Sequence, residues 1–546
     1  MTLDEVRRWA SGRGISTSDF RLVHDGALLH AISRLLQAIY RESRVTRLSQ
    51  HARGRWRLDV GRGTVLRAPV SGPLPFRKLE TIGRPWTAKS GKRRPIRTSS
   101  AFLAALQRAL VGSEYSSVFA PLRTDFENSV ANIVLNRLLG SALGRKARAI
   151  EPAFEGHHYY PFPALRHGPS LPQVVACSNL REQPVDLPLI EIGACRLISA
   201  VFTDYAACFR SWSGLGVEEQ SGVLLPMHPW QPGLSPLVRE LLARGMAAVS
   251  RRTVKAMPLA SQRTCRVVRT HFDLKLPIDA TLTGEHRLLY RLNCENAPVV
   301  SALAKQVLQT NGQSVIEFQE DVAAILHIEP SIATHLSAIV RSPVRARRGE
   351  VIVPAINLWT GRHEAKTFLR GAGPARAEEF FNRYCRALMT GPVAFCSQWG
   401  MAFEPHMQNV YVGFRNGVPS RIVLRDLDNS ILDARRVRPL LREFGLRLQK
   451  DTWSAMPAFE IGGKRLVQAM LFGHLGEVMW RLALDHGVKM ERLAAIVEDT
   501  WSDLESTAPS ASARESIAKL RTWSNAVKAT LRTRLHRSTT MEFVKE

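Results

Sequence analysis

The chain lacks several features that define whole classes of proteins. No apolar run in its 546 residues approaches the length of a membrane span, and Met1 to Arg8 lacks the apolar core of a secretory signal. Its seven cysteines are dispersed, and no close pair has the spacing of metal ligands. These absences predict a cytoplasmic protein with reduced thiols, no membrane association and no structural zinc site.

Acidic residues are scarce relative to basic ones. The sequence has 48 Asp and Glu against 75 Lys and Arg, which gives a formal net charge of +27. Such an excess implies an anionic partner, which could be nucleic acid, a membrane surface or a small polyanion. The densest basic run, Lys89 to Arg97, is short and has no interleaved aromatic residues for stacking on bases. We therefore expect no nucleic-acid partner, although a basic nucleic-acid-binding protein stays open as the third-ranked alternative.

Length and pattern predict three domains of mixed α+β character. Residues 1–150 have mainly helical patterns, residues 151–360 have strands broken by Pro and Gly, and residues 361–546 have helices around a β-hairpin. The expected helices are Leu28 to Glu42, Glu127 to about Arg148, Arg465 to His486, Met490 to Glu505 and Ser512 to Arg537. The expected strands are Ile192 to Phe202, Arg266 to Ile278 and Val351 to Trp359, and Leu66 to Arg97, with five prolines, is expected to be a loop.

A predicted hairpin brings polar groups together at its open end. Val410 to Phe414 and Arg421 to Leu424 are typical of short buried strands, and Asn416 to Pro419 has the residues of a tight turn. A turn centred there places Asn409 opposite Asp426, just after three more polar residues: Glu404, His406 and Gln408. Hard-oxygen groups in this arrangement suit a Mg²⁺ ion that also holds nucleotide phosphates. The alternative is a polar hairpin end satisfied by water and backbone.

A second constellation is rich in fixed cations and hydroxyls. It comprises Ser261, Arg263, Thr264, Lys275, Thr283 and Arg287. We expect Arg263 and Lys275 at opposite ends of one strand. Arg binds planar anions through two hydrogen bonds and Lys acts as a point charge, so this set predicts a clamp for phosphate or carboxylate. A solvated edge strand is the alternative.

Two further stretches carry weaker signals. Glu155 to Pro161 contains the adjacent histidines His157 and His158 in a loop rich in Gly and Pro, which by itself is more often structural than catalytic. Pro226 to Gln231 contains Trp230 between prolines, so we expect a rigid packed corner with His228 hydrogen-bonded inside it.

Taken together, these elements resemble the siderophore synthetases that work without a nonribosomal peptide synthetase, the IucA/IucC-like family. The resemblance extends from about Glu127 to the C-terminus. The matching motifs are, in chain order, Glu127 to Asn132, His228-Pro229-Trp230-Gln231, Ser261-x-Arg263-Thr264 with Lys275, Thr283 and Arg287, Glu404-x-His406-x-Gln408-Asn409, Arg425-Asp426, and Lys528 to Leu535. Their joint order and spacing carry the resemblance, because no single motif is decisive.

The resemblance implies a cupped-hand fold with a helical N-terminal domain and two antiparallel-sheet domains around a central cleft. It implies ATP-dependent adenylation of citrate or a related polycarboxylate, followed by attack of an amine or alcohol, in an enzyme that often forms homodimers. ATP would bind His157, Ser261, Arg263, Thr264, Lys275, Gln408, Asn409 and Asp426; Mg²⁺ would bind Glu404 and Asp426; the carboxylates would bind Thr283, Arg287, His406 and Lys528. Arg263, Lys275, Arg287 and His406 are the expected catalytic residues.

This sequence departs from the resembled pattern at several places. His158, Tyr160 and Ala164 replace a usual proline, histidine and lysine after Gly156. Met407 replaces a usual glycine, and Asp428-Asn429 replaces a glycine-rich end. A kinase-like phosphotransferase is the other enzyme that this hairpin could indicate, since kinases also chelate Mg²⁺ with an Asn and an Asp. The sequence lacks the Gly-rich phosphate loop of a kinase.

Overall fold

Among the residues that the structure describes, the fold combines helices with six β-sheets, five of them wholly antiparallel. We describe it from a computed structural model that covers residues 1–51, 55–61, 66–89, 92–142, 151, 155–180, 183–216, 223–312, 316–359, 368–449, 459–525, 527–536 and 543–544. This α+β architecture is the predicted fold class. None of the helices in the described part of the chain has the length and apolar character that a bilayer span requires.

The N-terminal region contains four helices and a five-stranded antiparallel sheet. The helices are α1 (Leu3–Ser11), α2 (Thr17–Glu42), α3 (Ser99–Ala109) and α4 (Phe119–Ala142). The strands, in spatial order, are β1 (Thr46–His51), β2 (Arg55–Val60), β3 (Leu66–Val70), β4 (Trp86–Lys89) and β5 (Lys92–Pro95). The prediction of a loop from Leu66 to Arg97 was therefore wrong. Leu66, Ala68 and Val70 alternate as buried residues, a strand pattern that the prolines obscured.

An eight-stranded antiparallel sheet forms the second region, and helices surround it. Its strands, in spatial order, are β8 (Cys195–Ser199), β16 (Asp321–His327), β17 (Ser337–Arg341), β12 (Asp273–Lys275), β11 (Thr264–Val267), β10 (Ala247–Pro258), β7 (Val185–Ile192) and β9 (Val223–Pro226). The helices of this region are α5 (Leu171–Ala176), α6 (Tyr205–Ser213), α7 (Gln231–Leu234), α8 (Pro236–Ala243), α9 (Arg291–Asn311) and α10 (Pro330–His335). The predicted strand Ile192 to Phe202 is replaced by β8, which follows the end of β7 after a short turn.

The predicted strand Arg266 to Ile278 is two strands. Thr264 pairs with Lys275 across the antiparallel pair β11–β12, and the chain reverses between Val267 and Asp273. Arg263 and Lys275 were expected at opposite ends of one strand, and this was wrong: they lie at the same end of the strand pair. A small three-stranded sheet joins the earlier strand β6 (Arg166–His167) to β13 (Thr281–Leu282) and β14 (Glu285–His286), which follow β12 along the chain.

The predicted hairpin is present as β20 (Val410–Arg415) and β21 (Val418–Leu424), but its register differs by one residue. The turn consists of Asn416 and Gly417, both at positive φ, instead of being centred between 416 and 419. A bulge between Gly413 and Phe414 shifts the pairing again, so Val410 faces Leu424 and Asn409 faces Arg425. The pairing of Asn409 with Asp426 was therefore wrong.

The hairpin belongs to a four-stranded sheet with β15 (Ile316–Phe318), parallel to β21, and β18 (Glu350–Pro354). The predicted strand Val351 to Trp359 is thus shorter and runs into the 3₁₀ turn Ala355–Asn357. Strands from both sides of residue 360 share this sheet, and the domain boundaries near 150 and 360 stay a prediction. Short 3₁₀ turns at Met407–Asn409 and Leu427–Asn429 flank the hairpin, and β19 (Met401–Ala402) pairs with β22 (Ile431–Leu432).

The C-terminal region is mainly helical. Its elements are α12 (Pro374–Trp399), α13 (Ala434–Glu443), α14 (Phe459–Val467), the π-helix Gln468–Leu475, α15 (Gly476–His486), α16 (Met490–Ser506), α17 (Ala511–Thr522), a 3₁₀ turn (Trp523–Asn525), β23 (Val527–Lys528), α18 (Thr530–Leu535) and β24 (Phe543–Val544). The predicted helix Ser512 to Arg537 was wrong in its second half, because β23 interrupts it.

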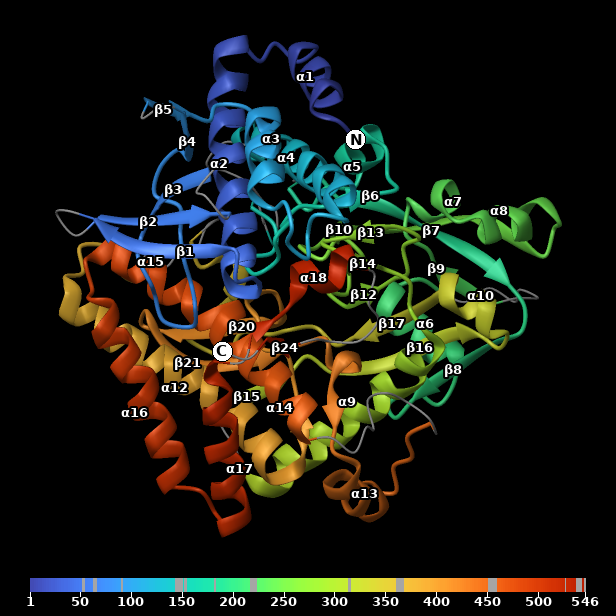
Figure 1. The fold of residues 1–546 in the computed structure, drawn as a ribbon. Coiled ribbons are helices and arrows are strands. Elements are labelled where there is room, and N and C mark those ends of the chain that lie inside the picture. The colour runs from blue at the N-terminus through green and yellow to red at the C-terminus, as the bar shows by residue number, and fades with distance from the viewer. Residues whose placement is uncertain are drawn as a thin grey trace.

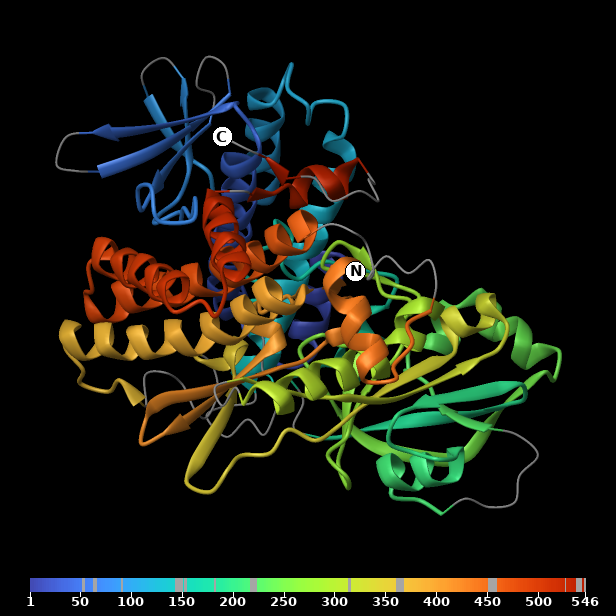
Figure 2. The same ribbon diagram turned by 90° about the horizontal axis from the view of Figure 1, so that it is seen from below.

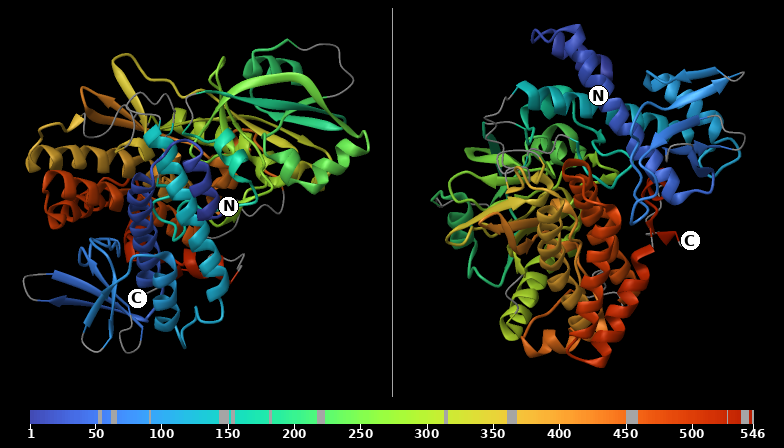
Figure 3. Two further views of the ribbon diagram at one scale, coloured as in Figure 1. Left: turned by 90° about the horizontal axis from the view of Figure 1, so that it is seen from above. Right: turned by 90° about the vertical axis from the view of Figure 1, so that its left-hand side faces the viewer.

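The three regions meet at the centre of the molecule. The five-stranded and eight-stranded sheets lie at opposite ends, with helices between them (Figures 1 and 3), and α16 and α17 pack together on a third side (Figure 2). Leu531 and Leu535 of α18 pack into the same hydrophobic core as α2. The last described helix thus returns to the N-terminal region. All seven cysteines are free thiols.

Candidate active site

One pocket at this meeting point gathers most of the residues singled out in the sequence. Twelve of the thirteen predicted site residues line it: His157, Ser261, Arg263, Thr264, Thr283, Arg287, Glu404, His406, Gln408, Asn409, Asp426 and Lys528. We call this the inner pocket. The thirteenth residue, Lys275, does not line it.

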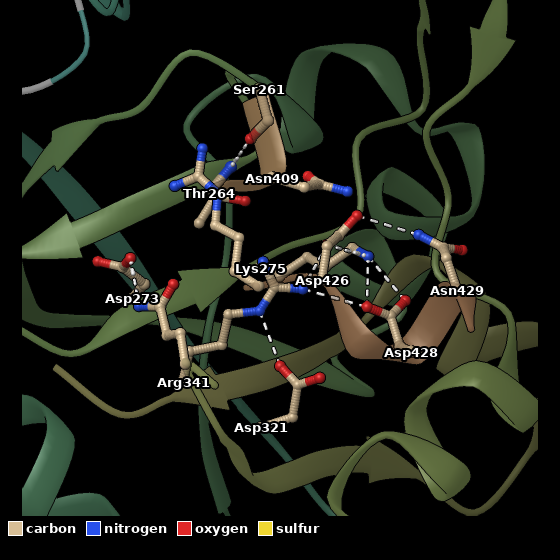
Figure 4. Close-up of polar contacts among 12 residues, drawn as sticks. Ser261, Thr264, Asp273, Lys275, Asp321, Arg341, Asn409, Asp426, Asp428 and Asn429 are labelled. Atoms are coloured by element: carbon tan, nitrogen blue, oxygen red, sulfur yellow. Dashed lines mark hydrogen bonds and ion pairs between the residues drawn. The ribbon is translucent and has the colours of Figure 1, made fainter. Parts of the chain in front are cut away.

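Lys275 lies behind the pocket wall, where its ammonium group forms ion pairs with the carboxylates of Asp426 and Asp428. Its side chain is 1% exposed, and Nζ lies 2.8 Å from Oδ1 of Asp426 and 2.7 Å from both oxygens of Asp428. Figure 4 shows these contacts beneath Asp426. In this structure Lys275 thus fixes the position of a pocket carboxylate and has no direct access to the pocket.

Arg341 shares the same carboxylates and was not identified from the sequence. Its Nη2 lies 2.5 Å from Asp426 and 3.1 Å from Asp428, and its Nε lies 2.8 Å from Asp321 (Figure 4). Unlike Lys275, Arg341 lines the inner pocket. It is the last residue of the buried strand β17, where no motif marks it, so the only signal in the sequence was a charge at the end of an apolar strand.

Three carboxylates and two cations form this buried cluster, and burial raises the pKa of one carboxylate, Asp321, to about 7. Burial alone would raise the pKa of Asp426, but Lys275, Arg341 and Arg263 outweigh it and hold the pKa well below the usual value. Asp426 therefore remains ionised. Its other oxygen accepts a hydrogen bond of 3.1 Å from the amide of Asn429, which also lines the pocket. Asp428 and Asn429, which depart from the resembled pattern, are thus the residues that hold Lys275 and Asp426.

The loop before the hairpin is fixed by ion pairs to distant elements. Glu404 accepts a hydrogen bond of 2.9 Å from Arg465 on α14, and the backbone carbonyl of Gln408 accepts bonds from Arg425. Arg425 in turn is bound by the buried carboxylate of Glu151 at 2.6 Å. These contacts hold Glu404, His406, Gln408 and Asn409 against one side of the pocket.

Two neutral histidines face each other in this wall. The ring centroids of His157 and His406 lie 5.0 Å apart, nearly perpendicular to one another. Burial lowers the pKa of both, and the neighbouring His406 adds to the effect at His157. Near neutral pH both rings are uncharged and can accept or donate a hydrogen bond. The π-helix packs behind them, where a Cβ on Gly473 would lie 3.2 Å from Cβ of His406.

A strained turn presents the remaining predicted residues. Thr283 and Gly284 connect β13 to β14 with φ of +54° and +109°, and the first of these is unusual for a β-branched residue. Arg287 closes the turn, because its Nη2 donates to the Thr283 hydroxyl at 2.5 Å and its Nε donates to the Leu282 carbonyl at 3.1 Å. This geometry holds Thr283 and Arg287 at the pocket wall.

Three cations that line the inner pocket have no carboxylate partner among the described residues. Arg166 is 6% exposed and bonds only to the amide oxygens of Asn132, Asn136 and Gln262. Arg263 is 9% exposed and donates to the Leu288 carbonyl at 3.3 Å. No ion pair or hydrogen bond of the Lys528 ammonium is found within the described part of the chain. Burying unpaired charge costs free energy, so these cations indicate an anionic ligand.

The packed corner at Pro226 to Gln231 was predicted correctly. His228 is fully buried and does not line the pocket; its ring contacts the Gln262 carbonyl at 3.1 Å and the Trp230 backbone N–H at 3.2 Å. The corner thereby supports the turn that carries Arg263.

The pocket residues fit a magnesium ion that is shared with a nucleotide. No cluster of three or more His, Cys, Asp or Glu side chains in the described residues could hold a metal by itself. Mg²⁺ in nucleotide sites is usually held by one or two carboxylates together with substrate phosphates and water. Asp426 and Glu404, both ionised and both at the pocket wall, match that donor set.

Comparison with known sequences identifies similarity to siderophore synthetases. The model of a family described as "IucA / IucC family" matches residues 146–359, and that of "Ferric iron reductase FhuF-like transporter" matches residues 378–542. Staphyloferrin A synthase of Staphylococcus aureus is 24% identical over 250 residues, which are 43% of this chain and 42% of the relative. The uncharacterized protein y4xN of Sinorhizobium fredii is 25% identical over 406 residues, 65% of this chain and 63% of the relative. The matched parts thus span less than two thirds of these relatives.

Solved structures match the fold over nearly the whole chain. The petrobactin biosynthesis protein AsbB of Bacillus anthracis has a TM-score of 0.78 at 14% identity and covers 96% of this chain and 95% of its own. The ATP-bound aerobactin synthetase IucA of Klebsiella pneumoniae has a TM-score of 0.76 at 15% identity and covers 94% and 98%. The residues that match the FhuF-like description therefore belong to the same fold as the rest of the chain.

Proposed function

We propose that this chain is a siderophore synthetase of the IucA/IucC-like family and that it adenylates a carboxylate of citrate or a related polycarboxylate with ATP. The acyl group would then be condensed with an amine or alcohol. ATP use is supported by the ATP-bound aerobactin synthetase that shares the fold. Since ATP is supplied in the cytoplasm, we expect the enzyme to act there.

The observation that carries this proposal is the set of unpaired pocket cations Arg166, Arg263 and Lys528. ATP and a tricarboxylate are both polyanions, and each needs positive charge that the protein has not already neutralised. The paired cations Lys275 and Arg341 serve a different purpose, because they fix Asp426. We therefore propose Arg263 as a direct phosphate ligand and Lys275 as a positioning residue that acts through Asp426 and Asp428.

The nucleotide would lie along the wall built from β11, the hairpin and the loop at His157. Its ligands in this proposal are His157, Ser261, Arg263, Thr264, Gln408, Asn409 and Asp426. Glu404 and Asp426 would hold Mg²⁺, which, when bound, would neutralise phosphate charge. His157 and His406 suit this wall because each neutral ring can donate a hydrogen bond to a phosphate oxygen without adding a positive charge to the pocket.

The polycarboxylate would bind at Thr283, Arg287 and Lys528, and His406 would contact it from the nucleotide wall. Coulomb repulsion opposes the approach of a carboxylate to the α-phosphate in a poorly hydrated pocket. Arg263 lines the same pocket and would reduce this repulsion. One carboxylate oxygen would attack phosphorus, pyrophosphate would leave, and the nucleophile would then displace AMP to give an amide or ester.

The test is to measure pyrophosphate, AMP and ADP when ATP, Mg²⁺ and a panel of carboxylic acids are supplied. We expect citrate or a related acid to release pyrophosphate and to support ATP–pyrophosphate exchange without any amine. The Asp426→Ala variant should lose this release, while the surface variant Arg383→Gln on α12 should keep it. Release of ADP in place of AMP would instead indicate a phosphotransferase, and persistence in Asp426→Ala at ordinary Mg²⁺ would remove Asp426 from the metal site.

A further inference from the structure

A second pocket opens from the inner one toward solvent. It shares Tyr160, Arg263, Glu285, Arg287 and Lys528 with the inner pocket, and it continues past Tyr290, whose side chain is 59% exposed. We call it the outer pocket. A substrate that enters here would reach an acyl group held at Thr283 and Arg287, which line the inner pocket.

Cations dominate the outer pocket as well. Its charged residues are Arg263, Arg287, Arg465, Lys528 and Arg534 against the carboxylates Glu285 and Asp428. Both oxygens of Asp428 are bonded to Lys275, so Asp428 is already neutralised. Glu285 stands at the boundary of the two pockets, with the Tyr160 hydroxyl at 3.4 Å and Arg287 at 3.2 Å. A diamine, which carries two positive charges at neutral pH, would meet mostly like charge here.

Arg534 is the one cation that lines the outer pocket but not the inner one, within the described residues. The aliphatic part of the Arg534 side chain packs against the turn that contains Gly284, because Cδ of Arg534 lies 3.6 Å from where a Cβ on Gly284 would be. Gly284 has φ of +109°, and a side chain there would be strained and would crowd Arg534.

The guanidinium of Arg534 is oriented from behind by a buried carboxylate. Asp125 on α4 is 5% exposed in its side chain and accepts from Nε at 2.8 Å and from Nη2 at 3.2 Å. His167 also contacts Asp125, at 2.7 Å. No contact of the Arg534 Nη1 atom is found among the described residues. This arrangement fixes the fork of the guanidinium and leaves donors for a planar anion.

We propose that the outer pocket binds the second substrate and that this substrate is an amine that also carries a carboxylate, such as an α-amino acid. Its carboxylate binds Arg534 and its amino group lies beside Glu285, next to the activated acyl group. This inference rests on the proposed function and adds the chemical class of the nucleophile. Glu285 serves as an anchor for the ammonium form, because it is half exposed and paired with Arg287.

The chemical step balances without a further reactant. The ammonium group first loses a proton to solvent, and the nitrogen lone pair then forms a bond to the acyl carbon. The bond from that carbon to the adenylate oxygen breaks, and AMP leaves with the electron pair. The nitrogen releases a second proton to solvent as the amide forms.

The experiment compares amino acids with their decarboxylated partners in the wild-type enzyme. The pairs are ornithine and putrescine, 2,3-diaminopropionate and ethylenediamine, and serine and ethanolamine, read by AMP release and product mass in the presence of the activated acid. We expect the carboxylated member of the productive pair to have a kcat/KM at least about 10-fold higher. Equal or better use of the decarboxylated partner overturns the inference.

Substitution of Arg534 tests whether this residue binds the carboxylate of the second substrate. Arg534→Gln should raise KM for the amino acid about 10-fold and leave KM for the decarboxylated partner within a factor of two, and Arg534→Lys should restore part of the loss. Arg383→Gln, the same substitution on a distant exposed helix, should change neither KM. Equal KM changes for both partners overturn the assignment of Arg534.

ATP–pyrophosphate exchange, which needs no amine, separates the two proposals. If exchange fails with every acid in the wild-type enzyme, the proposed function fails. If exchange proceeds and the decarboxylated amines are the better nucleophiles, only the class of the second substrate is wrong. Wild-type rates of ATP–pyrophosphate exchange in a variant would also show that the variant is folded.

Discussion

Two groups of buried cations in this molecule differ in how their charges are balanced. Near the N-terminal sheet, Arg34 and Lys78 bind Glu80 at 3.1 and 2.8 Å, and both lie close to Glu477 of α15, at 3.6 and 2.8 Å. In the inner pocket, Arg166, Arg263 and Lys528 have no carboxylate partner among the described residues.

The difference separates a structural cluster from a binding site. The paired cluster joins α2 and the segment before β4 to the C-terminal helix α15, and its charges satisfy one another in the folded protein. The second group has no ion pair with a carboxylate among the described residues, so a bound anion would supply the missing counter-charge. Removing a charge should therefore affect stability in the first group and turnover in the second, and the predictions below test this contrast.

The largest effect on stability is expected for Glu477→Ala. Its side chain is 3% exposed and contacts Lys78, Arg34 and Arg481, so its loss leaves buried cations unpaired. Breaking a buried pair on one side typically costs about 3–5 kcal/mol. Urea unfolding at pH 7 should show this loss in the free energy of unfolding. A change below about 1 kcal/mol would mean that this cluster does not hold the two regions together.

The next prediction contrasts Arg263 with Lys275, which lie at the same end of the strand pair β11–β12. Arg263→Ala should lower turnover by roughly 10²–10³-fold, the scale for losing a preorganised charge partner, with little loss of stability. Lys275→Ala should lower turnover to a similar extent and also destabilise the fold, because it leaves Asp426 and Asp428 with one cation fewer.

Turnover and urea unfolding, measured on both variants, distinguish the two roles. If Lys275→Ala loses turnover without losing stability, Lys275 acts as a direct ligand and not as a positioning residue. Near wild-type turnover in Arg263→Ala would reject its assignment to the phosphates.

The comparison also shows what the sequence could predict. Twelve of the thirteen site residues converge as the motifs implied, since spacing and residue type carry that information. The register of the hairpin did not follow from the sequence, because the bulge at Gly413 and the two-residue turn each shift the pairing without a distinctive signal. Asn409 and Asp426 nevertheless both line the inner pocket.

The partners of the charges could not be predicted, because they come from distant segments. Lys275 matched the motif of a phosphate ligand, yet Asp428, 153 residues away, occupies its ammonium group. Arg341 is the last residue of a buried strand and belongs to none of the motifs found in the sequence. The five-stranded sheet was missed because prolines at Pro69 and Pro95 favoured a loop, although the alternation of buried residues in β3 was present.

A smaller effect is expected from the pH dependence of the paired cluster. Burial lowers the pKa of His158 to about 4, while Glu477 opposes the shift and Arg34 and Arg481 add to it. In the unfolded chain the pKa is near 6.5, so the unfolded state binds more protons between pH 6.5 and 4. The free energy of unfolding should therefore fall as pH falls through this window, by up to about 1.4 kcal/mol per pH unit from this group.

The measurement compares His158→Gln with the wild-type protein in urea unfolding at pH 7, 6 and 5. The variant should show a shallower dependence on pH, because Gln does not titrate. An unchanged slope would mean that His158 does not remain neutral in the folded protein. The difference between the two proteins removes the contribution of other groups, such as Glu42, whose buried carboxyl has a pKa raised to about 7 by burial.

The smallest effect should follow from breaking an ion pair of ordinary geometry on the surface. Arg383 and Glu379 lie one turn apart on α12, with Nη2 and Oε1 3.1 Å apart and side chains 57% and 64% exposed. Exposed pairs of this spacing contribute about 0.3–0.5 kcal/mol, since water already solvates both charges. Arg383→Gln should therefore change the free energy of unfolding by no more than this and leave turnover unaltered. A loss comparable to that of Glu477→Ala would show that net charge, and not burial and pairing, controls the response, and the contrast between the two clusters would lose its basis.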